Sequence, residues 1–315
     1  MAISRSQLVK ELEPGLNALF GLEYKRYENQ HAEIYTSENS DRAFEEEVML
    51  SGFANAQVKG EGAGVSFDEA QETFTARYTH ETVALAFAIT EEAIEDNLYD
   101  RLAARYTKAL ARSMSNAKQV KAVEPLINGL PSTNTFKSGD GVSLFNTSHT
   151  TVAGSFKNTL STQADLNETS LEQSMIDIAK MTDERGLRIA ARGLKMIIPS
   201  ELQFTAERLM KSQGRTGTAD NDINAIVSMG MIPQGYRVNN YLTDSDAFYI
   251  ITDVPNGMKM FTRAPLTTAM EGDFDTGNDD KQFRLLRSAE DPENEDATAA
   301  FASVVVCINL VELQS

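Results

Sequence analysis

The sequence has no tryptophan, one cysteine and only three histidines among its 315 residues. A single cysteine cannot close an internal disulfide. Cys307 also lies in the apolar run 304–308, which favours a small buried side chain over a nucleophile or a ligand. His31, His80 and His149 are far apart without a paired spacing, so neither a zinc site nor a Ser-His-Asp arrangement is indicated. We expect no metal and no cofactor.

Basic residues and long apolar runs are also scarce. Lysine and arginine number 29 against 46 acidic residues, and the net charge of −17 has the wrong sign for tight, general binding to nucleic acid. No window approaches the ~20 apolar residues of a membrane span, and the first residues do not resemble a signal peptide. We expect a soluble chain that folds in the cytoplasm and does not contact a membrane.

A chain of this length buries roughly three quarters of its unfolded surface, so a sizeable core needs no covalent staple. The first fifty residues mix charges and aromatics without a sustained period, and Pro14-Gly15 and Gly21 interrupt helix formation. This predicts an extended arm with short helical pieces. Residues 52–89 favour β-structure, because glycines punctuate 60–64 and polar and larger side chains alternate over 73–80. We expect a long hairpin-like excursion there.

A helix of some thirty residues is predicted from Thr90 to Glu124. Thr90 is a suitable N-cap, acidic residues occupy the first turn, and Pro125 with Asn128-Gly129 ends the helix. At 1.5 Å per residue this helix is about 50 Å long, which suits an extended, flat subunit. The expected packed face consists of Ile94, Leu98, Leu102, Tyr106, Ala109 or Leu110, Ala117 and Val120.

The rest of the chain alternates between helices and strands after a polar region at 130–165, which is expected to form loops and to have room for a short hairpin. A helix is expected to open with a capping box from Thr169 to Glu172 and to close at Gly186, with Leu171, Met175, Ile178 and Met181 on one face. Further expected elements are a strand at 194–198, a helix at 199–214, a polar loop at 214–222, a short helix at 223–229, strands at 247–252 and 258–263 around a turn at 254–257, and a strand at 299–311.

Three motifs suggest chemistry but have simpler interpretations. The glycines at 60, 62 and 64 match neither a dinucleotide fingerprint nor a Walker A motif, so a flexible hairpin tip is favoured. Ser115 to Lys118 matches Ser-x-x-Lys without its companion motifs and lies inside the long helix. The run 273–278 resembles a calcium loop, but its glycine is fifth rather than sixth and position twelve is Arg284. We therefore expect no catalytic residues.

Several strings in chain order resemble the major capsid proteins of tailed bacteriophages, including major head subunits of Mu-like prophages. These strings are FEEEV at 44–48, GF at 52–53, KGEG at 59–62, AFAITEEAIEDNLYD at 86–100, TADNDIN at 218–224, YLTD at 241–244 and MEGDFDTGN at 270–278. They span most of the chain. The resemblance is weakest in the C-terminal forty residues, where the acidic stretch 290–296 departs from the pattern.

The resemblance implies the α+β Hong Kong phage capsid fold. In that fold, residues 1–50 are an N-terminal arm and 51–85 an extended β-loop. Residues 86–164 are the first part of a peripheral domain with a long spine helix, 165–258 are an axial domain, and 259–315 return to the peripheral domain as strands.

The function implied is structural. Subunits form hexamers and pentamers that close an icosahedral shell around the genome in the virion, after assembly in the host cytoplasm. The implied partners are copies of the chain itself, a separate scaffolding protein, the portal, decoration proteins and, through non-specific inner-surface contact, packaged DNA. The residues expected at contacts between subunits are Leu16, Leu19, Phe20, Lys59, Glu61 and Phe67. Some relatives join subunits by a lysine to asparagine isopeptide bond, for which Lys59 is a candidate donor.

Two alternatives remain open at this point. A shell protein of an encapsulin-like nanocompartment shares the same fold. A soluble enzyme with a helical and an α/β domain also fits the pattern of elements, although the sequence offers no convincing catalytic set.

Overall fold

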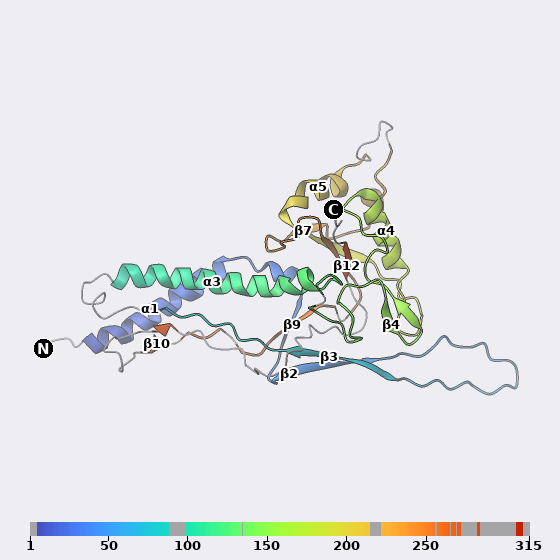
Figure 1. Cartoon of the computed structure of the whole chain (residues 1–315), viewed down its shortest axis with the longest axis horizontal. Coiled ribbons are helices and arrows are strands. Elements are labelled where there is room, and N and C mark those ends of the chain that lie inside the picture. Colours follow the sequence, from blue (N-terminus) through green and yellow to red (C-terminus); the bar gives the residue numbers. More distant parts are fainter. Residues whose placement is uncertain are drawn as a thin grey trace.

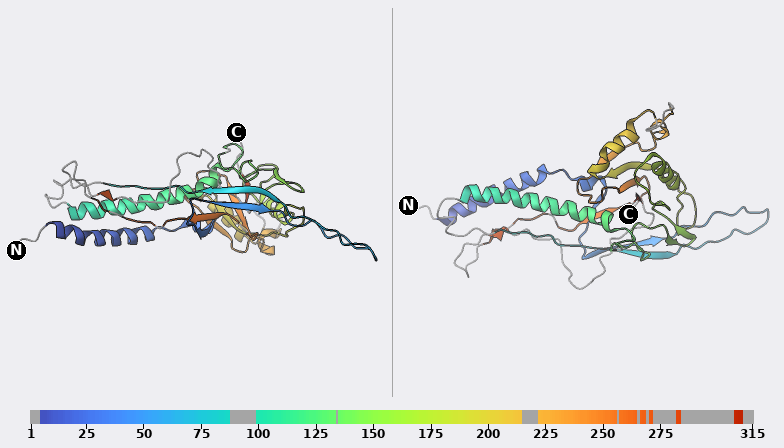
Figure 2. Two further views of the ribbon diagram at one scale, coloured as in Figure 1. Left: turned by 90° about the horizontal axis from the view of Figure 1, so that it is seen from below. Right: turned by 45° about the horizontal axis from the view of Figure 1, so that its top comes forward.

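The structure is a computed structural model that describes residues 5–87, 99–133, 135–214, 222–255, 257–264, 266–268, 270–271, 282–283 and 307–310. The molecule is elongated (Figure 1). Two helices lie side by side at one end, a long loop extends from the other, and a sheet flanked by helices rises between them (Figures 1 and 2). Such a shape leaves much surface for other molecules to cover.

The paired helices are α1 (Arg5–Arg26) and α3 (Tyr99–Asn128). Leu16 and Phe20 of α1 are buried in a cluster with residues of α3, namely Ala103, Leu110, Ala111 and Met114. The prediction that Pro14-Gly15 and Gly21 interrupt any helix is therefore wrong. Burial of a large apolar side chain contributes about 1.5–3 kcal/mol, and several such contacts offset the helix penalties of about 3 kcal/mol for proline and about 1 kcal/mol for each glycine.

The helix α3 confirms the predicted long helix from Tyr99 onward, whereas Thr90 and the expected first turns lie outside the described residues. The predicted packed face is confirmed only in part. Leu110 is buried as predicted, but Tyr106 and Val120 are about half exposed, and Ala111 and Met114, which were not predicted, are buried. The helix continues one turn beyond the predicted end and carries Pro125 inside its last turn.

Gly129 follows the last residue of α3 at a position where a side chain does not fit. A Cβ atom at Gly129 would lie 2.4 Å from the carbonyl oxygen of Pro125 and 2.9 Å from the Leu144 side chain. The main chain of Gly129 also accepts a hydrogen bond of 2.8 Å from the amide of Phe145. The helix end is thereby fixed against residues 144–145.

The predicted β-excursion has a paired stem. Strands β2 (Phe44–Leu50) and β3 (Glu72–Thr79) are antiparallel, from Phe44 opposite Thr79 to Leu50 opposite Glu72. The predicted alternation over 73–80 is confirmed, since Ala76 and His80 are buried and Thr75, Arg77 and Thr79 are exposed. Residues 51–71 form the loop beyond the stem, here called the extended loop, which projects as a narrow excursion in Figure 1.

A four-stranded sheet lies in the second half of the chain, with the order β12-β8-β6-β7. Its strands are β6 (Gly193–Ile198), β7 (Tyr236–Val238), β8 (Phe248–Thr252) and β12 (Cys307–Leu310). Strand β7 runs parallel to β6, and β8 runs antiparallel to β6 and β12. The predicted strands at 194–198 and 247–252 are confirmed. Of the strand expected at 299–311, the described part is β12, which pairs with β8.

Helices α4 (Glu168–Ala179), α5 (Gln203–Lys211) and α6 (Ala225–Met229) and the 3-10 turn η2 (Ser200–Leu202) accompany this sheet. All four apolar residues predicted for one face of α4 are buried in the sheet's main core, together with Met196, Ile198, Phe248 and Ile250. Asn167, not Thr169, caps α4 in a reciprocal pair with Ser170, and the helix ends before Gly186. Gly186 instead has φ +81° in the following turn.

The other face of the sheet packs on the end of α3. Ile197 and Tyr249 point to this side and form a second core with Val123 and Leu126 of α3. The Tyr249 hydroxyl donates a hydrogen bond of 3.0 Å to the carbonyl oxygen of Leu126. Strand side chains alternate between the two faces of a sheet. One face therefore packs against the end of α3, and the other packs against α4, α5 and α6.

The remaining elements are short. They are η1 (Gln30–Glu33), β1 (Thr36–Asn39) parallel to β9 (Lys259–Thr262), the hairpin of β4 (His149–Thr151) and β5 (Gly154–Phe156), and β10 (Met270–Glu271) paired with β11 (Gln282–Phe283). The hairpin expected within 130–165 is thus confirmed. The predicted strands around the turn at 254–257 both form, but β8 and β9 belong to different sheets. Most of the polar loop expected at 214–222 lies outside the described residues.

Candidate assembly surfaces

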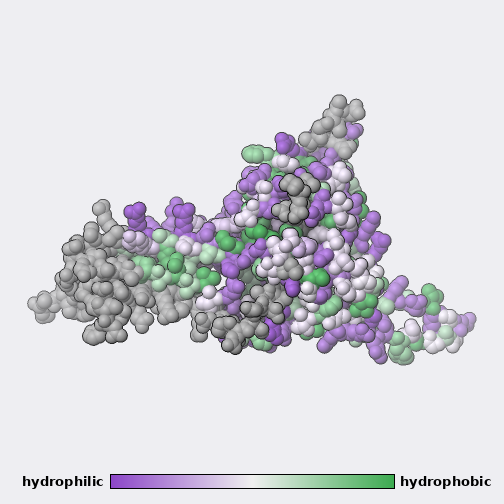
Figure 3. Space-filling view, in the orientation of Figure 1, coloured by the Kyte–Doolittle hydropathy of each residue, from purple (hydrophilic) through white to green (hydrophobic). Residues whose placement is uncertain are grey.

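The extended loop exposes large apolar side chains to solvent. Val58 and Phe67 are 100% and 96% exposed, and Phe53, Val65 and the adjacent Leu50 are each more than 60% exposed. Hydrophobic residues alternate with hydrophilic ones along this excursion in Figure 3. Single exposed apolar residues are ordinary, but several on one narrow projection indicate a surface that another molecule covers.

The stem beneath the loop is held by cross-strand contacts. The Arg77 guanidinium donates to Glu46 on the opposite strand at 2.6 and 2.8 Å and lies 4.3 Å from the centre of the Phe44 ring. Lys259 of β9 forms ion pairs with Glu47 of the stem and with Glu38 of β1. These contacts fix the stem to the body, so that the loop starts from a defined place.

At its base the extended loop is held to the body by one arginine. The Nε atom of Arg185 donates 2.9 Å to the carbonyl oxygen of Gly52, and its Nη2 atom donates 2.5 Å to that of Glu69. The same Nη2 atom lies 3.4 Å from Asp68, whose other carboxylate oxygen accepts 2.6 Å from the amide of Ala54. The Ala54 amide and, more weakly, the Arg185 charge lower the pKa of Asp68.

The six residues predicted at contacts between subunits fall into two groups. Lys59, Glu61 and Phe67 are exposed on the extended loop. Leu16 and Phe20 are buried against this chain's own α3, and Leu19 is half-buried. Leu16 and Phe20 therefore find packing within their own chain, where they complete a core with α3.

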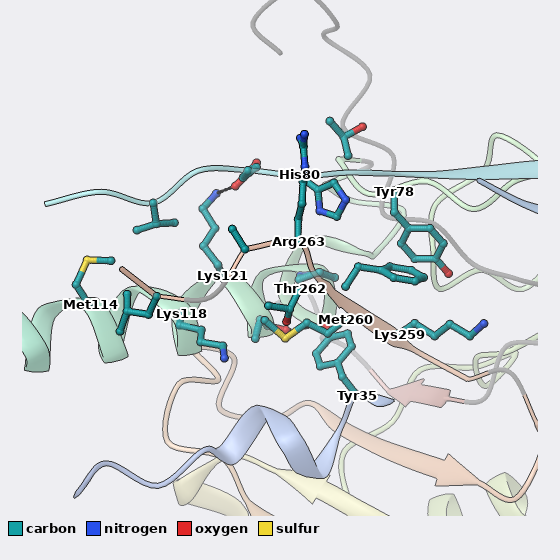
Figure 4. Close-up of a pocket in the computed structure, with 18 of the residues that line it drawn as sticks. Tyr35, Tyr78, His80, Met114, Lys118, Lys121, Lys259, Met260, Thr262 and Arg263 are labelled. Carbon is teal, nitrogen blue, oxygen red and sulfur yellow. Dashed lines mark hydrogen bonds and ion pairs between the residues drawn. The ribbon is translucent and has the colours of Figure 1, made fainter. Parts of the chain in front are cut away.

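A groove lies beside the stem, between α3, the chain after β3 and the strand β9, with a volume of about 390 Å³. In Figure 4, Met114, Lys118 and Lys121 project from α3 beneath the segment that carries Tyr78 and His80. The remaining walls are largely apolar and include Tyr24, Tyr35, Val83, Ala122, Pro125, Met260, Phe261, Ala264 and Leu266.

The cations of this groove differ in their partners. Lys121 lies 3.1 Å from Glu81 and 3.0 Å from Glu124. No carboxylate of the described residues pairs with Lys118 or Arg263, and burial lowers the pKa of Lys118. Burial, then the nearby Arg263 charge, also lowers the pKa of His80. The groove therefore offers an apolar floor beside positive charge that is only partly neutralised.

The motifs with a possible chemical role are explained by structure. Ser115 is buried inside α3, away from any companion motif, and the glycines at 60–64 form a tight turn in which the Ala63 amide donates 3.1 Å to Gly60. The resemblance to a calcium loop at 273–278 lies outside the described residues. Within the described part of the chain, no group of three or more His, Cys, Asp or Glu side chains could hold a metal ion.

The three histidines are buried rather than exposed. His149 lies between Asp140 at 3.0 Å and Asn158 at 3.2 Å. Burial opposes ionisation of Asp140, but its bonds to His149 and to two main-chain amides outweigh that effect and lower its pKa. This arrangement joins the β4–β5 hairpin to residue 140. Among the described residues, no helix is both long enough and apolar enough to cross a membrane.

Arg185 and the groove cations were not predicted from the sequence. Gly52 and Arg185 are separated by 133 positions, and no periodicity or motif connects them. The sequence also did not indicate that Lys118 lines a groove, because an isolated lysine on a helix is ordinarily solvated.

Comparison with known proteins gives a consistent assignment. Residues 72–299 match the family model described as phage capsid protein. The capsid of bacteriophage JBD30, decorated with minor capsid protein trimers, is similar with a TM-score of 0.51 and 11% identity over 69% of this chain and 92% of that chain. The JBD30 procapsid has a TM-score of 0.51 and 13% identity over 76% of this chain and 100% of that chain.

The capsid of the Myoviridae phage XM1 aligns over 89% of each chain with 11% identity and a TM-score of 0.48. A search of curated proteins gives no significant match. The family model covers well over half of the sequence. The two JBD30 structures share the α+β capsid fold with this chain. On this basis the chain belongs to the phage capsid protein family, as a structural protein of the virion shell rather than an enzyme.

Proposed function

We propose that the chain is the major head subunit of a tailed phage and that it assembles as hexamers and pentamers into an icosahedral shell. The observation that carries this proposal is the extended loop, whose apolar side chains are largely exposed to solvent. A loop that cannot bury Val58 and Phe67 on its own subunit gains stability by burying them on a neighbour.

The groove beside α3 is the surface we propose for the neighbour's loop. Its floor is apolar, and Lys118 and Arg263 lack a carboxylate partner among the described residues. The loop supplies the complementary chemistry, because the aromatic Phe67 is followed two positions later by the acidic Glu69. Complementary charge of this kind fixes the register of an interface more than it raises affinity.

We further propose a division of labour along the chain. Residues 1–50 act as the arm, 51–85 as the loop, 86–164 and 259–315 as the peripheral domain, and 165–258 as the axial domain around the ring centre. Assembly in the host cytoplasm, a separate scaffolding protein, a portal, decoration proteins and non-specific contact of DNA with the inner surface complete this proposal. The structure of the arm modifies its role, since Leu16 and Phe20 support α3 of their own subunit and Leu22, 69% exposed, is the better candidate for a neighbour.

The substitution Phe67→Ser tests the loop's role. Truncating an aromatic anchor of an interface costs about 2 kcal/mol, so the concentration needed for assembly is expected to rise about thirtyfold. The circular dichroism of the free subunit is expected to stay unchanged, because Phe67 is 96% exposed. Sedimentation of a concentration series measures the assembly threshold.

Ser66→Ala is the matched control, since it alters the neighbouring exposed position without removing apolar area. We expect its assembly threshold to equal that of the unmodified protein. Shells that form at the same threshold with Phe67→Ser as without it would show that Phe67 is not an anchor.

A further inference from the structure

The turn after α4 holds its backbone in a fixed conformation. The carboxylate of Asp183 accepts hydrogen bonds from the amides of Arg185 at 2.9 Å and Leu187 at 2.8 Å. The main chain closes the same turn, because the Asp183 amide donates 2.7 Å to the carbonyl oxygen of Leu187. The Ala153 amide donates 2.9 Å to Glu184 and joins the turn to the β4–β5 hairpin. Arg185 therefore extends from a rigid base.

The guanidinium of Arg185 bonds both legs of the extended loop at once. Its bond to Gly52 holds the outgoing leg, and its bond to Glu69 holds the returning leg. The contact with Asp68 adds an ion pair on the returning leg. The arginine side chain is only 15% exposed, although the loop around it is open to solvent.

These bonds lie directly beyond the end of the stem. The last main-chain bond between the legs is the 2.8 Å bond from the Ser51 amide to the carbonyl oxygen of Gln71. Between residues 52 and 70, no hydrogen bond or ion pair other than those of Arg185 connects the loop to the body in the described residues. Beyond the stem, a single side chain therefore holds the described part of the loop to the body.

We propose that Arg185 is a positioning residue for assembly, which fixes the direction of the extended loop before a neighbour captures it. Its planar fork suits this task, because two carbonyl oxygens and a carboxylate can be bonded by one rigid group. A lysine at the same position offers a single ammonium and cannot span both legs in a fixed geometry.

The effect on assembly follows from preorganisation. A loop that is already held in one direction loses less conformational freedom when it docks. A mobile loop can dock only from the fraction of subunits in which it has the orientation that the neighbour binds. This part rests on the proposed docking of the loop on a neighbouring subunit. The orientation of the loop in the free subunit does not depend on it.

The orientation is measured on free subunits separated from shells by size exclusion. Spin labels are placed on the returning leg of the loop through Ser66→Cys and on α4 through Thr169→Cys, with Cys307→Ala to remove the native thiol. We expect pulsed electron resonance to show a narrow distance distribution that broadens with Arg185→Ala. Arg185→Lys is expected to give an intermediate width, and the control Arg188→Ala, an exposed arginine of the same turn, to leave it narrow.

Assembly is then followed by light scattering with unlabelled protein. Arg185→Ala is expected to slow shell formation about tenfold, while Arg188→Ala matches the unmodified rate. An unchanged distance distribution for Arg185→Ala overturns the inference, and a broadened distribution with an unchanged assembly rate overturns the positioning role. If the unmodified protein forms no shells, the proposed function fails, whereas the distance measurement still tests the role of Arg185 in the free subunit.

Discussion

Replacing Phe20 with alanine tests whether α1 belongs to the core of its own subunit. Phe20 is 3% exposed, packs in the cluster of α1 and α3, and stacks on Tyr24 with ring centres 5.9 Å apart. Truncating a buried phenylalanine costs about 3–5 kcal/mol. Because the loss falls on one helix interface, we expect α1 to undock locally before the rest of the molecule unfolds.

The lower limit of about 3 kcal/mol raises the population of the open helix about 150-fold, since each 1.4 kcal/mol is a factor of ten. Hydrogen exchange of the α1 amides in free subunits measures this change directly. Leu22→Ala is the control, because Leu22 is 69% exposed on the same helix and its truncation costs less than about 0.5 kcal/mol. Normal protection of α1 in Phe20→Ala free subunits, with a defect seen only in shells, would refute the reasoning and place Phe20 against a neighbour.

Two further predictions concern the sheet and the turn that carries Arg185. Tyr249→Phe leaves the carbonyl oxygen of Leu126 without its 3.0 Å donor at the joint between the sheet and α3, so the free energy of unfolding in urea is expected to fall by about 1–2 kcal/mol. Burial, and secondarily the neighbouring Asp183, raises the pKa of Glu184, so its ionised form destabilises the fold at neutral pH. Glu184→Gln is therefore expected to raise the melting temperature at pH 7 and to give no gain near pH 4, where the carboxyl is protonated; an equal gain at both pH values would contradict this cause.

The sequence predicts secondary structure and burial best where a single element shows a regular spacing of apolar residues. The face of α4 was predicted residue by residue, because Leu171, Met175 and Ile178 repeat at helical spacing and all are buried. The alternation before His80 likewise predicted β3, since strand side chains alternate between faces. In both segments local periodicity and tertiary burial agree.

The failures have a common physical cause in packing between distant segments. Helix α1 contains a proline and two glycines, so its local propensity is poor, and only its contact with α3 makes it continuous. The packed face of α3 was misjudged for the same reason. Its small buried residues Ala103 and Ala111 face α1 and carry little apolar signal, whereas the larger Tyr106 is exposed. The hydrogen bonds of Arg185 to the extended loop also join segments that are far apart in the sequence, so no local pattern predicts them.

Electron microscopy of the purified, unmodified chain tests the central claim most directly. Closed icosahedral shells are predicted, in which each extended loop crosses onto a neighbouring subunit and Phe67 is covered in the groove beside that neighbour's α3. Particles that remain monomeric, or shells in which every extended loop stays in solvent with Phe67 uncovered, would contradict the account.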